Sequence, residues 1–516
     1  MKVNTLATFI SFVFGVSAAG IHDGRSVKAK RATSILFNPP GLPPLPRIEE
    51  ATRKANTGGL NLNDVQGDIL IGMRKPVELF LFFGISNATD FKVKLKGEIL
   101  PLVTTTAQIL RDDTSAPSTL LNIAFSNTGL VALNATGEAN NLNDTAFAAG
   151  QVNDVKNLSD PGTVNWVPQF VGTNIHGVIL LASDTEDNIN STLSSLQSTL
   201  GDSISEIYSL RGAMRPPPNK GHEHFGFLDG ISNPTLDVFQ DSKPGQALVP
   251  AGEILVGQPG DNVTRPDWAK DGSFLVFRQL KQLVPEFPKF LADSPILEPG
   301  LSQEQGSDLL GARMVGRWKS GAAVFLSPMF DDPDLGRDYN RNNNFTFADP
   351  GQTKSNLTDQ SKCPLSAHIR KTRPRADLGP LPENSTNHHM VRAGIPYGPE
   401  VTTDEASSNT TEIERGLAFV SYQSNIMNGF QFLQQAWANT PTFRQPGVGF
   451  DPIIGMLCFV FNRCGGAAAG ADRPVNGLDP TDPARNFTLH TDFVVSRGGE
   501  YFFAPSLPAI ANTLSL

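Results

Sequence analysis

The stretch Val77-Glu-Leu-Phe-Leu-Phe-Phe83 decides how the body of this chain folds. It is short, rich in β-branched and aromatic residues and bounded by turn residues, which is typical of a β-strand. Three further stretches have the same character, namely Gly177–Ala182, Ser273–Arg278 and Met456–Phe461. Strands that recur along so much of the chain predict that β-sheet forms the body of the protein.

Two segments between these strands, Asp187–Gly201 and Ile426–Ala438, carry apolar residues at helical spacing. The strands do not alternate regularly with helices, and no G-x-G-x-x-G motif follows any of them, which weakens a doubly wound dinucleotide-binding fold. We therefore expect an α+β fold with two strand-rich halves that meet near Asp241–Gly245. Val77–Phe83 and Ser273–Arg278 would begin the two halves.

The composition excludes several classes of protein. The 516 residues are 39% hydrophobic and 18% charged, as in ordinary globular proteins. Lys and Arg number 42 against 51 Asp and Glu, a net charge of −9, and no dense basic run is present, so neither nucleic acid nor a membrane is expected as a partner. Three cysteines are too few for a disulfide scaffold or a Cys-based zinc site.

The first 60 residues look like processing segments. Residues 1–19 combine an early lysine, an apolar run and small residues, the pattern of a secretory signal peptide, and the run is too short to span a bilayer. Residues 20–60 contain a dibasic pair, Lys30-Arg31, and several prolines, which favours a loose pro-segment. Ordered sequence is expected to begin near Asn61.

Secretion is also supported by N-x-[S/T] sequons, the acceptor sites of N-glycosylation. We expect a soluble, extracellular glycoprotein. The sequons are at Asn87, Asn134, Asn143, Asn157, Asn190, Asn262, Asn344, Asn356, Asn384, Asn409 and Asn486.

Among the histidines, His368 has the most distinctive setting, because four cations follow it within seven residues. An imidazole for iron beside cations for carboxylates suits a dianionic cofactor such as haem, although a basic loop with an incidental histidine explains the same pattern. His222-Glu-His224 has the spacing of two metal ligands on a strand, but it lacks a third ligand and is more simply a polar approach to a turn. His388-His389 favours a solvated loop.

Two further motifs each allow a structural and a functional interpretation. Asp229-Gly230, between apolar residues, is by default a tight turn, yet a carboxylate held in an apolar pocket can also shuttle protons. Arg392, in the run Met390–Gly398, is most simply a surface cation, whereas in a pocket it would stabilise developing negative charge.

Taken together, several motifs resemble one family, the fungal secreted dye-decolorising peroxidases. The motifs are D-V-Q-G-D-I-L at Asp64–Leu70, G-F-L-D-G at Gly226–Gly230, A-R-M-V-G-R-W at Ala312–Trp318, A-H-I-R-K-T-R-P-R at Ala367–Arg375, R-A-G-I-P-Y-G at Arg392–Gly398 and G-L-A-F-V-S-Y-Q at Gly416–Gln423. They follow the family's order from about residue 61 to the C-terminus.

The resemblance implies a haem b enzyme of two ferredoxin-like halves, each an antiparallel sheet with peripheral helices, with the haem between them. The halves would be residues 61–245 and 246–516, the second binding the haem. The family uses hydrogen peroxide to oxidise bulky anthraquinone and azo dyes, phenols and lignin-like aromatics. A monomer and a dimer are both compatible with it.

The resemblance also assigns roles to residues. His368 would be the proximal iron ligand, with Asp451 accepting its N–H, and Arg375 would pair with a haem propionate. This chain has Arg373 where the family's run carries Asn. Asp229 would be the distal acid/base and Arg392 its charged partner. Leu417 and Phe419 would narrow the peroxide channel.

An aspartate base fits work in acid, since a free Asp has a pKa of about 3.9 against about 6.5 for His. Bulky dyes that cannot reach the haem would need a relay at the surface, for which the resemblance suggests Trp437 or Tyr397. Polar Gln434 and Gln435 next to Trp437 suggest that this tryptophan is partly exposed.

Two other classes of function remain open at this point. A secreted acidic glycoprotein can be a glycoside hydrolase that uses Asp229, although no second acid stands out as its partner. It can also be a binding protein without catalysis. A haem absorption band in the purified protein separates the peroxidase from both.

Overall fold

The computed structural model describes residues 36–111, 116–135, 137, 141–380, 388–456, 472–482 and 484–516. Its strands are β1 (Val77–Ile85), β2 (Thr119–Phe125), β3 (Gly177–Ser183), β4 (Ile204–Ala213), β5 (Thr235–Leu236), β6 (Leu248–Val249), β7 (Ser273–Gln282), β8 (Val391–Arg392), β9 (Ile395–Tyr397), β10 (Gly416–Gln423), β11 (Arg473–Val475), β12 (Phe487–Leu489) and β13 (Val494–Ala504).

The α-helices are mostly short, and several continue into 3-10 or π-helical turns. They are α1 (Ile48–Thr57), α2 (Gly67–Ile71), α3 (Ala88–Lys94), α4 (Thr106–Arg111), α5 (Asn127–Ala132), α6 (Thr145–Ala149), α7 (Gln151–Asp154), α8 (Glu186–Leu200), α9 (Glu286–Asp293), α10 (Gln303–Val315), α11 (Pro333–Arg337), α12 (His368–Thr372), α13 (Thr403–Ser408), α14 (Phe430–Phe432) and α15 (Leu507–Ala509). Among the described residues, no helix has the length and apolar character needed to cross a bilayer.

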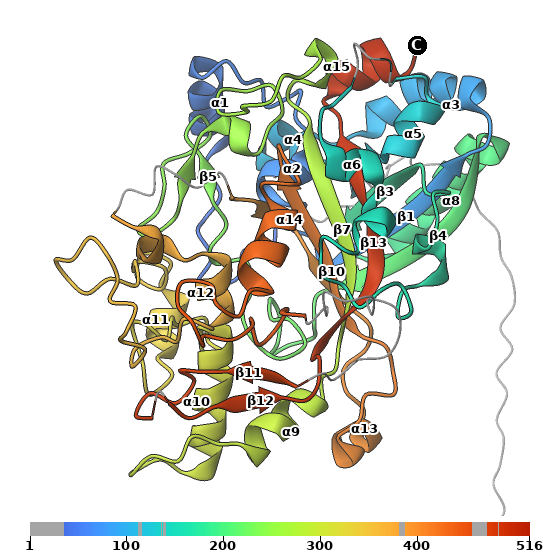
Figure 1. Ribbon diagram of the computed structural model, residues 1–516. Coiled ribbons are helices and arrows are strands. Elements are labelled where there is room, and N and C mark those ends of the chain that lie inside the picture. Colours follow the sequence, from blue (N-terminus) through green and yellow to red (C-terminus); the bar gives the residue numbers. More distant parts are fainter. Residues whose placement is uncertain are drawn as a thin grey trace, which may run out of the picture.

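The nine main strands form one antiparallel sheet that closes on itself. Its order is β7-β13-β2-β3-β1-β4-β9-β10-β8, and β7 also pairs with β10, which completes a barrel. In Figure 1, β7, β10 and β13 lie at the centre, β1, β3 and β4 to their right, and α10, α11 and α12 to their left. The expected α+β fold is confirmed.

Each half of the barrel repeats the same strand order. In the N-terminal sheet the order is β4-β1-β3-β2, and in the C-terminal sheet it is β13-β7-β10-β9, so both read fourth, first, third, second strand along the chain. This is the order of a ferredoxin-like unit. The two sheets meet through single residue pairs only, Phe125 with Phe503 and Gly212 with Tyr397. Two ferredoxin-like sheets therefore build the barrel.

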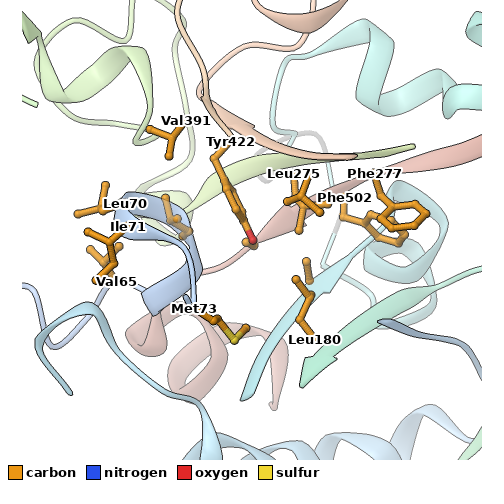
Figure 2. Close-up of a cluster of buried hydrophobic side chains, with 14 of the residues drawn as sticks. Val65, Leu70, Ile71, Met73, Leu180, Leu275, Phe277, Val391, Tyr422 and Phe502 are labelled. Atoms are coloured by element: carbon orange, nitrogen blue, oxygen red, sulfur yellow. The ribbon is translucent and has the colours of Figure 1, made fainter. Parts of the chain in front are cut away.

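Side chains fill the barrel interior. Phe82 of β1 is fully buried and contacts the rings of Phe277 in β7 and Phe502 in β13, so both sheets contribute to one core. Figure 2 shows Tyr422 of β10 in the same cluster, with Leu180 of β3 nearby. The interior of the barrel is therefore closed to a haem, and the space that the resemblance places between residues 61–245 and 246–516 has to lie outside the barrel.

Most of the predicted elements form. Val77–Phe83, Gly177–Ala182 and Ser273–Arg278 are confirmed as parts of β1, β3 and β7, and Asp187–Gly201 as α8. Of the predicted strand Met456–Phe461, all but Met456 lies outside the described residues.

The second predicted helix, Ile426–Ala438, begins four residues later than expected. Ile426–Gly429 forms a turn, α14 covers Phe430–Phe432, and Leu433–Ala438 continues as a π-helix. The spacing of apolar residues alone does not distinguish an α-helix from such a widened π-helical turn.

The N-terminal segment differs from the expectation of a loose chain. Residues 1–35, which include the predicted signal peptide and Lys30-Arg31, lie outside the described residues. From residue 36 onward the chain packs on the body, and α1 buries Ala51 and Ala55 completely.

Candidate functional site

A large cavity lies on the outer face of the C-terminal sheet. It encloses about 1810 Å³ of space not filled by protein, part of it open to solvent. Leu280 of β7 and Leu417 and Phe419 of β10 form its floor, because residues at alternate positions of these strands point away from the barrel interior. The opposite walls come from the loop 223–234 and from α12, and no residue of β1–β4 lines it.

His368 begins α12 and stands at one wall of this cavity. Its Nδ1 lies 2.8 Å from Oδ2 of Asp451, whose side chain is fully buried. The other oxygen of Asp451 accepts hydrogen bonds from the backbone N–H groups of Ile453 and Ile454, at 2.8 and 3.0 Å. Burial raises the pKa of Asp451, but the charge of His368 and these bonds outweigh it, so the pKa is lowered and the carboxylate is ionised.

An ionised carboxylate accepts hydrogen bonds only, so Nδ1 of His368 carries the proton and donates it to Asp451. Nε2 is then the basic nitrogen. No hydrogen bond to this atom occurs among the described residues, and the His368 side chain retains 27% of its exposure, toward the cavity. An imidazole whose Nδ1–H is oriented by a buried carboxylate is the arrangement of a metal-ligating histidine.

Asp229 and Arg392 form an ion pair at another wall of the same cavity. Nη1 of Arg392 donates to Oδ1 of Asp229 at 2.6 Å, and the backbone N–H of Gly230 donates to the same oxygen at 2.6 Å. Gly230 has a φ of +88°, which a glycine adopts without strain, so the turn that was the simpler interpretation is also present. Burial alone would raise the pKa of Asp229, but Arg392 outweighs it and the pKa is lowered.

The backbone around Arg392 is fixed by Asn233. The side-chain amide of Asn233 donates to the carbonyl of Arg392 at 2.9 Å and accepts from its N–H at 3.1 Å. The loop that carries Asp229 is therefore tied directly to β8, which carries Arg392. The two charged groups cannot separate without breaking this link.

Glu223 holds the other end of the same loop. Its carboxylate accepts hydrogen bonds from the backbone N–H groups of Phe225 and Phe227, each at 2.8 Å, and from the side chain of Gln282. Sequence reasoning considered this acid only as the spacer in His222-Glu-His224. The clue was available: an acid just before a Gly- and Phe-rich turn has unsatisfied backbone amides within reach.

Arginines surround one side of the cavity. Arg375 donates to Oδ1 of Asn343 at 2.6 Å and to the backbone carbonyls of Asn343 and Phe345. Arg317, which sequence reasoning did not single out, donates to the same Oδ1 at 2.9 Å. Burial lowers the pKa of Arg317 to about 10, so it stays charged. Arg373 also lines the cavity.

These residues fit a haem. The basic Nε2 of His368 suits iron, the apolar floor suits the macrocycle, and the cluster of Arg317, Arg373 and Arg375 suits two propionates. Part of the hydrogen-bonding capacity of Arg375 is already used by Asn343, so the propionates would share the arginines. Within the described parts of the chain, no group of three or more His, Cys, Asp or Glu forms an alternative metal site.

The pair His222 and His224 is not a metal site. His224 is buried, its Nε2 lies 2.9 Å from the carbonyl of Tyr397, and burial lowers its pKa to about 4. The two residues belong to the polar approach to a turn.

Trp437 is buried, which corrects the expectation of a partly exposed residue. It retains 5% of its exposure and packs against the rings of His388, Phe432 and Phe443. Gln434 is buried with it, because its amide donates to Asn439 and to a backbone carbonyl.

His388 is not in a solvated loop either. Its ring stacks on Phe432 with centroids 3.8 Å apart, and it lines the cavity. His388 thus connects the cavity wall to Trp437. Tyr397 is buried outside the cavity, where its hydroxyl donates to Glu414 at 3.2 Å.

Comparisons with known proteins give the family. Two family models match: the DyP dimeric alpha+beta barrel domain over residues 64–216, and the Dyp-type peroxidase C-terminal domain over residues 335–445. Peroxidase 2 of Mycetinis scorodonius is 55% identical over 95% of this chain and 94% of its own. A dye-decolorizing peroxidase of Auricularia auricula-judae is 49% identical over 98% of this chain and 99% of its own.

The structural comparison agrees. A crystal structure of a fungal DyP-type peroxidase from A. auricula-judae superposes with a TM-score of 0.82 at 50% identity, covering 89% of this chain and 99% of that chain. The glycoside hydrolase and the non-catalytic binding protein find no support among these relatives. The chain belongs to the dye-decolorising peroxidases, a family of haem-dependent oxidoreductases.

Proposed function

We propose that this chain is an extracellular peroxidase in which Asp229 and Arg392 activate hydrogen peroxide opposite the iron ligand His368. One observation carries the proposal: the ion pair Asp229–Arg392 and the hydrogen-bonded pair His368–Asp451 stand at the walls of one cavity. One pair supplies a proton-transfer group and the other a metal ligand, which are the two parts that peroxide cleavage requires.

When bound, haem supplies the iron-centred redox chemistry that cleaves peroxide and withdraws electrons from the substrate. His368 would hold the iron, and the hydrogen bond to Asp451 would increase the donor strength of the imidazole. Arg317, Arg373 and Arg375 would hold the propionates. Leu417 and Phe419 would restrict the space beside Asp229 to a molecule of the size of peroxide.

Asp229 moves the proton. Peroxide arrives with one proton on each oxygen, and heterolysis requires both on the oxygen that leaves as water. The ionised carboxylate of Asp229 takes the proton from one oxygen and returns it to the other, so it ends in the state in which it began. A lowered pKa keeps this carboxylate ionised in acid.

Arg392 keeps its charge at every working pH and lies within 2.6 Å of Asp229. It stabilises the negative charge that develops on the leaving oxygen and holds Asp229 in its ionised form. Removing Asp229 and removing Arg392 are therefore expected to have different effects on the peroxide reaction.

We propose that large dyes and lignin-like aromatics are oxidised through the protein, and small phenols at the haem edge. The support is the aromatic contact between His388 at the cavity wall and Trp437, with ring centroids 5.3 Å apart. Tyr397 is the second candidate relay; it does not line the cavity itself, but it pairs in the sheet with Gly416, the neighbour of the lining residue Leu417. Both are buried, so electrons would reach them by transfer and not by contact with the dye.

We further propose that residues 1–19 direct secretion, that some of the sequons carry glycans, and that the enzyme is organised as residues 61–245 and 246–516. The support is the apolar run near the N-terminus and the density of sequons.

The decisive experiment combines a spectrum with one matched pair of variants. The wild-type protein is expected to bind haem with a Soret band and to react with hydrogen peroxide. His368→Ala is expected to lose stable haem, whereas His490→Ala, an exposed histidine that also pairs with an aspartate, keeps it. A protein that stays colourless when haem is supplied would refute the proposal.

A further inference from the structure

Residues 36–46 form a segment without helix or strand that lies across the outside of the candidate site, here called the strap. It leads directly into α1. Within the strap, Pro39 and Gly41 are buried. A segment with this composition buries its residues only where a surface is shaped to receive it.

Backbone and side-chain hydrogen bonds fix the strap on that surface. The N–H of Phe37 donates to the carbonyl of Arg74 at 2.9 Å, and the guanidinium of Arg74 donates to Oδ1 of Asn38 at 2.7 Å. Further along, the side-chain amide of the buried Asn342 donates to the carbonyl of Gly41 at 2.8 Å. The strap is therefore bound at its beginning and at its middle.

A second cavity lies directly beneath the strap. Asp229, Arg392 and Leu417 line this cavity and also the large one. Phe37, Pro39 and Leu42 of the strap form its outer wall. If haem fills the large cavity, the second cavity offers an approach to Asp229 from the other side.

Leu42 lines this approach and lies next to the residue that follows Asp229. A methyl group built on Gly230 would come within 3.2 Å of Cδ2 of Leu42, and Gly230 is the residue next to Asp229. The leucine side chain therefore packs on the backbone that presents the catalytic carboxylate.

We infer that the strap is an autoinhibitory cover that blocks the access of hydrogen peroxide to Asp229 until proteolysis removes it. The inference rests on the proposed function, because it names the regulation of the same site. The strap excludes a small ligand because it fills the entrance to the second cavity. His368 and the haem cavity are left intact.

The strap is held by an anchor that is followed by an exposed turn. In α1, Ala51 and Ala55 are fully buried and Lys54 pairs with Asp241 at 2.6 Å. The last two residues of α1, 56 and 57, and residue 59 in the turn that follows are exposed. Exposed turns are preferred sites of proteolysis, so a cut here would release the strap and α1 together. A cut at the dibasic pair Lys30-Arg31 would leave both in place.

The relatives are consistent with removal of this part. The Auricularia sequence matches 98% of this chain, whereas the crystallised Auricularia chain accounts for 89%. The barrel needs the C-terminal strand β13, which ends at Ala504, but no strand from the first 60 residues. The part of this chain that has no counterpart in the crystallised Auricularia chain is therefore expected to be its N-terminal end.

The test uses the full chain with a release site. Asn56→Lys with Thr57→Arg places a Lys-Arg pair at the exposed C-terminal end of α1, next to the turn. A dibasic-specific protease then frees the strap and α1, which gel filtration removes. The protease is chosen to cleave after Lys-Arg and not after Arg-Lys, because the chain also contains Arg53-Lys54 within α1. Lys30-Arg31, before the strap, is the one Lys-Arg pair of the wild-type sequence, which makes the treated wild type the matched control.

The probe is cyanide, whose binding to haem is read from the shift of the Soret band and requires no turnover. Its association rate is expected to rise about tenfold or more when the strap is removed, which corresponds to a strap that is open at most about a tenth of the time. The rate of reaction with hydrogen peroxide is expected to rise in parallel. Equal cyanide rates before and after removal would overturn the inference.

A pair of substitutions within the strap tests the mechanism without proteolysis. Leu42→Ala shortens the side chain at the entrance and is expected to speed cyanide binding severalfold. Leu45→Ala makes the same truncation three residues later, where the side chain packs on the core but does not line the second cavity. An equal effect of the two would mean that looser packing, and not an opened entrance, is responsible, and would overturn the inference.

The proposed function fails separately. If the strap-free protein binds haem and cyanide but does not react with peroxide, the peroxidase proposal is refuted, whatever the strap does. If the strap-free and full chains react with peroxide equally fast, the peroxidase proposal stands and the autoinhibition is refuted.

Discussion

Two aspartates with lowered pKa values serve the candidate site in different ways. Asp451 is enclosed by protein and bonded to His368, so its charge only orients and polarises the ring. Asp229 faces both cavities, so its charge can accept a proton from a ligand. The same residue type thus gives a fixed anion in one place and an exchangeable base in the other, and access makes the difference.

The first prediction concerns Asp229→Asn. The amide keeps the shape of the side chain but cannot take a proton, so the rate of reaction with hydrogen peroxide is expected to fall by about 10²-fold or more. Stopped-flow absorbance of the haem measures it. The resting spectrum should remain that of the wild type. A wild-type rate in this variant, with a slow rate in Arg392→Leu, would assign the cleavage to Arg392 alone.

The second prediction concerns the pH profile of Arg392→Leu. Asp229 is active when ionised, that is, above its pKa, and Arg392 lowers that pKa. Removing the guanidinium therefore raises the pKa, and the acid limb of the peroxide reaction moves to higher pH. Arg337→Leu, at an exposed arginine paired with Asp334, is the control and should leave the limb in place. An unmoved acid limb in Arg392→Leu would show that another group sets it.

At the scale of single residues, sequence motifs pointed to the candidate reactive groups, but not to the residues that hold those groups in place. Asp229, Arg392 and His368 stand in short motifs whose residue types state their role. Arg317 acts through hydrogen bonds to groups in another loop, and no local pattern reports such partners. Glu223 bonds to backbone N–H groups of its own loop, so its role left a signal in the local sequence.

Among the elements, the π-helix Leu433–Ala438 and α12 are tied to each other. The buried ammonium of Lys371 donates to the carbonyls of Trp437 and Thr440, at 3.3 and 2.7 Å. A relay at Trp437 would thereby be held in a fixed relation to the helix that carries His368.

The third prediction separates relay from packing at Trp437. Because this side chain is buried, Trp437→Ser leaves a cavity and destabilises the protein, so a loss of activity in that variant alone decides nothing. Trp437→Phe retains most of the volume but is harder to oxidise. We expect Trp437→Phe to lower the turnover of a bulky dye much more than that of a small phenol, at an unchanged rate of reaction with peroxide. Equal losses for both substrates would make Trp437 structural.

The helix that carries Trp437 shows what a pattern can and cannot predict. Its apolar spacing correctly indicated a helix, but two glutamines suggested an exposed face. Gln434 is buried because its amide has partners in Asn439 and a backbone carbonyl. A polar residue is inside wherever its hydrogen bonds are made, and those partners are set by the tertiary fold. Strands β8 and β9 have only two and three residues, which is too short for a strand pattern to be recognised in the sequence.

At the scale of the whole molecule, the barrel core and the haem cavity lie on opposite faces of the C-terminal sheet. Phe277 points into the core and Leu280 into the cavity, from the same strand. A substitution in the barrel core is therefore expected to lower the stability of the protein without changing the reaction in the cavity.

The fourth prediction follows from this separation. Phe82→Ala removes a fully buried ring that contacts Phe170, Tyr208, Phe277 and Phe502. It is expected to cost about 3–5 kcal/mol of unfolding free energy, seen as a lower melting temperature of the haem-loaded protein. The Soret band and the peroxide rate at low temperature should not change. Phe330→Ala, at an exposed phenylalanine, should leave both stability and rate unaltered.

The repeated strand order gives the haem cavity a counterpart in the other half of the barrel. On the outer face of the N-terminal sheet, Leu79 and Leu81 are covered by α3 and α8, in contact with residues such as Phe91 and Ile189 (Figure 1). On the C-terminal sheet, the equivalent face lines the cavity. A haem bound in this cavity would take the position that a pair of helices takes in the sister unit. It would then be a layer of the architecture, and its insertion would complete the second half of the fold as helix docking completes the first.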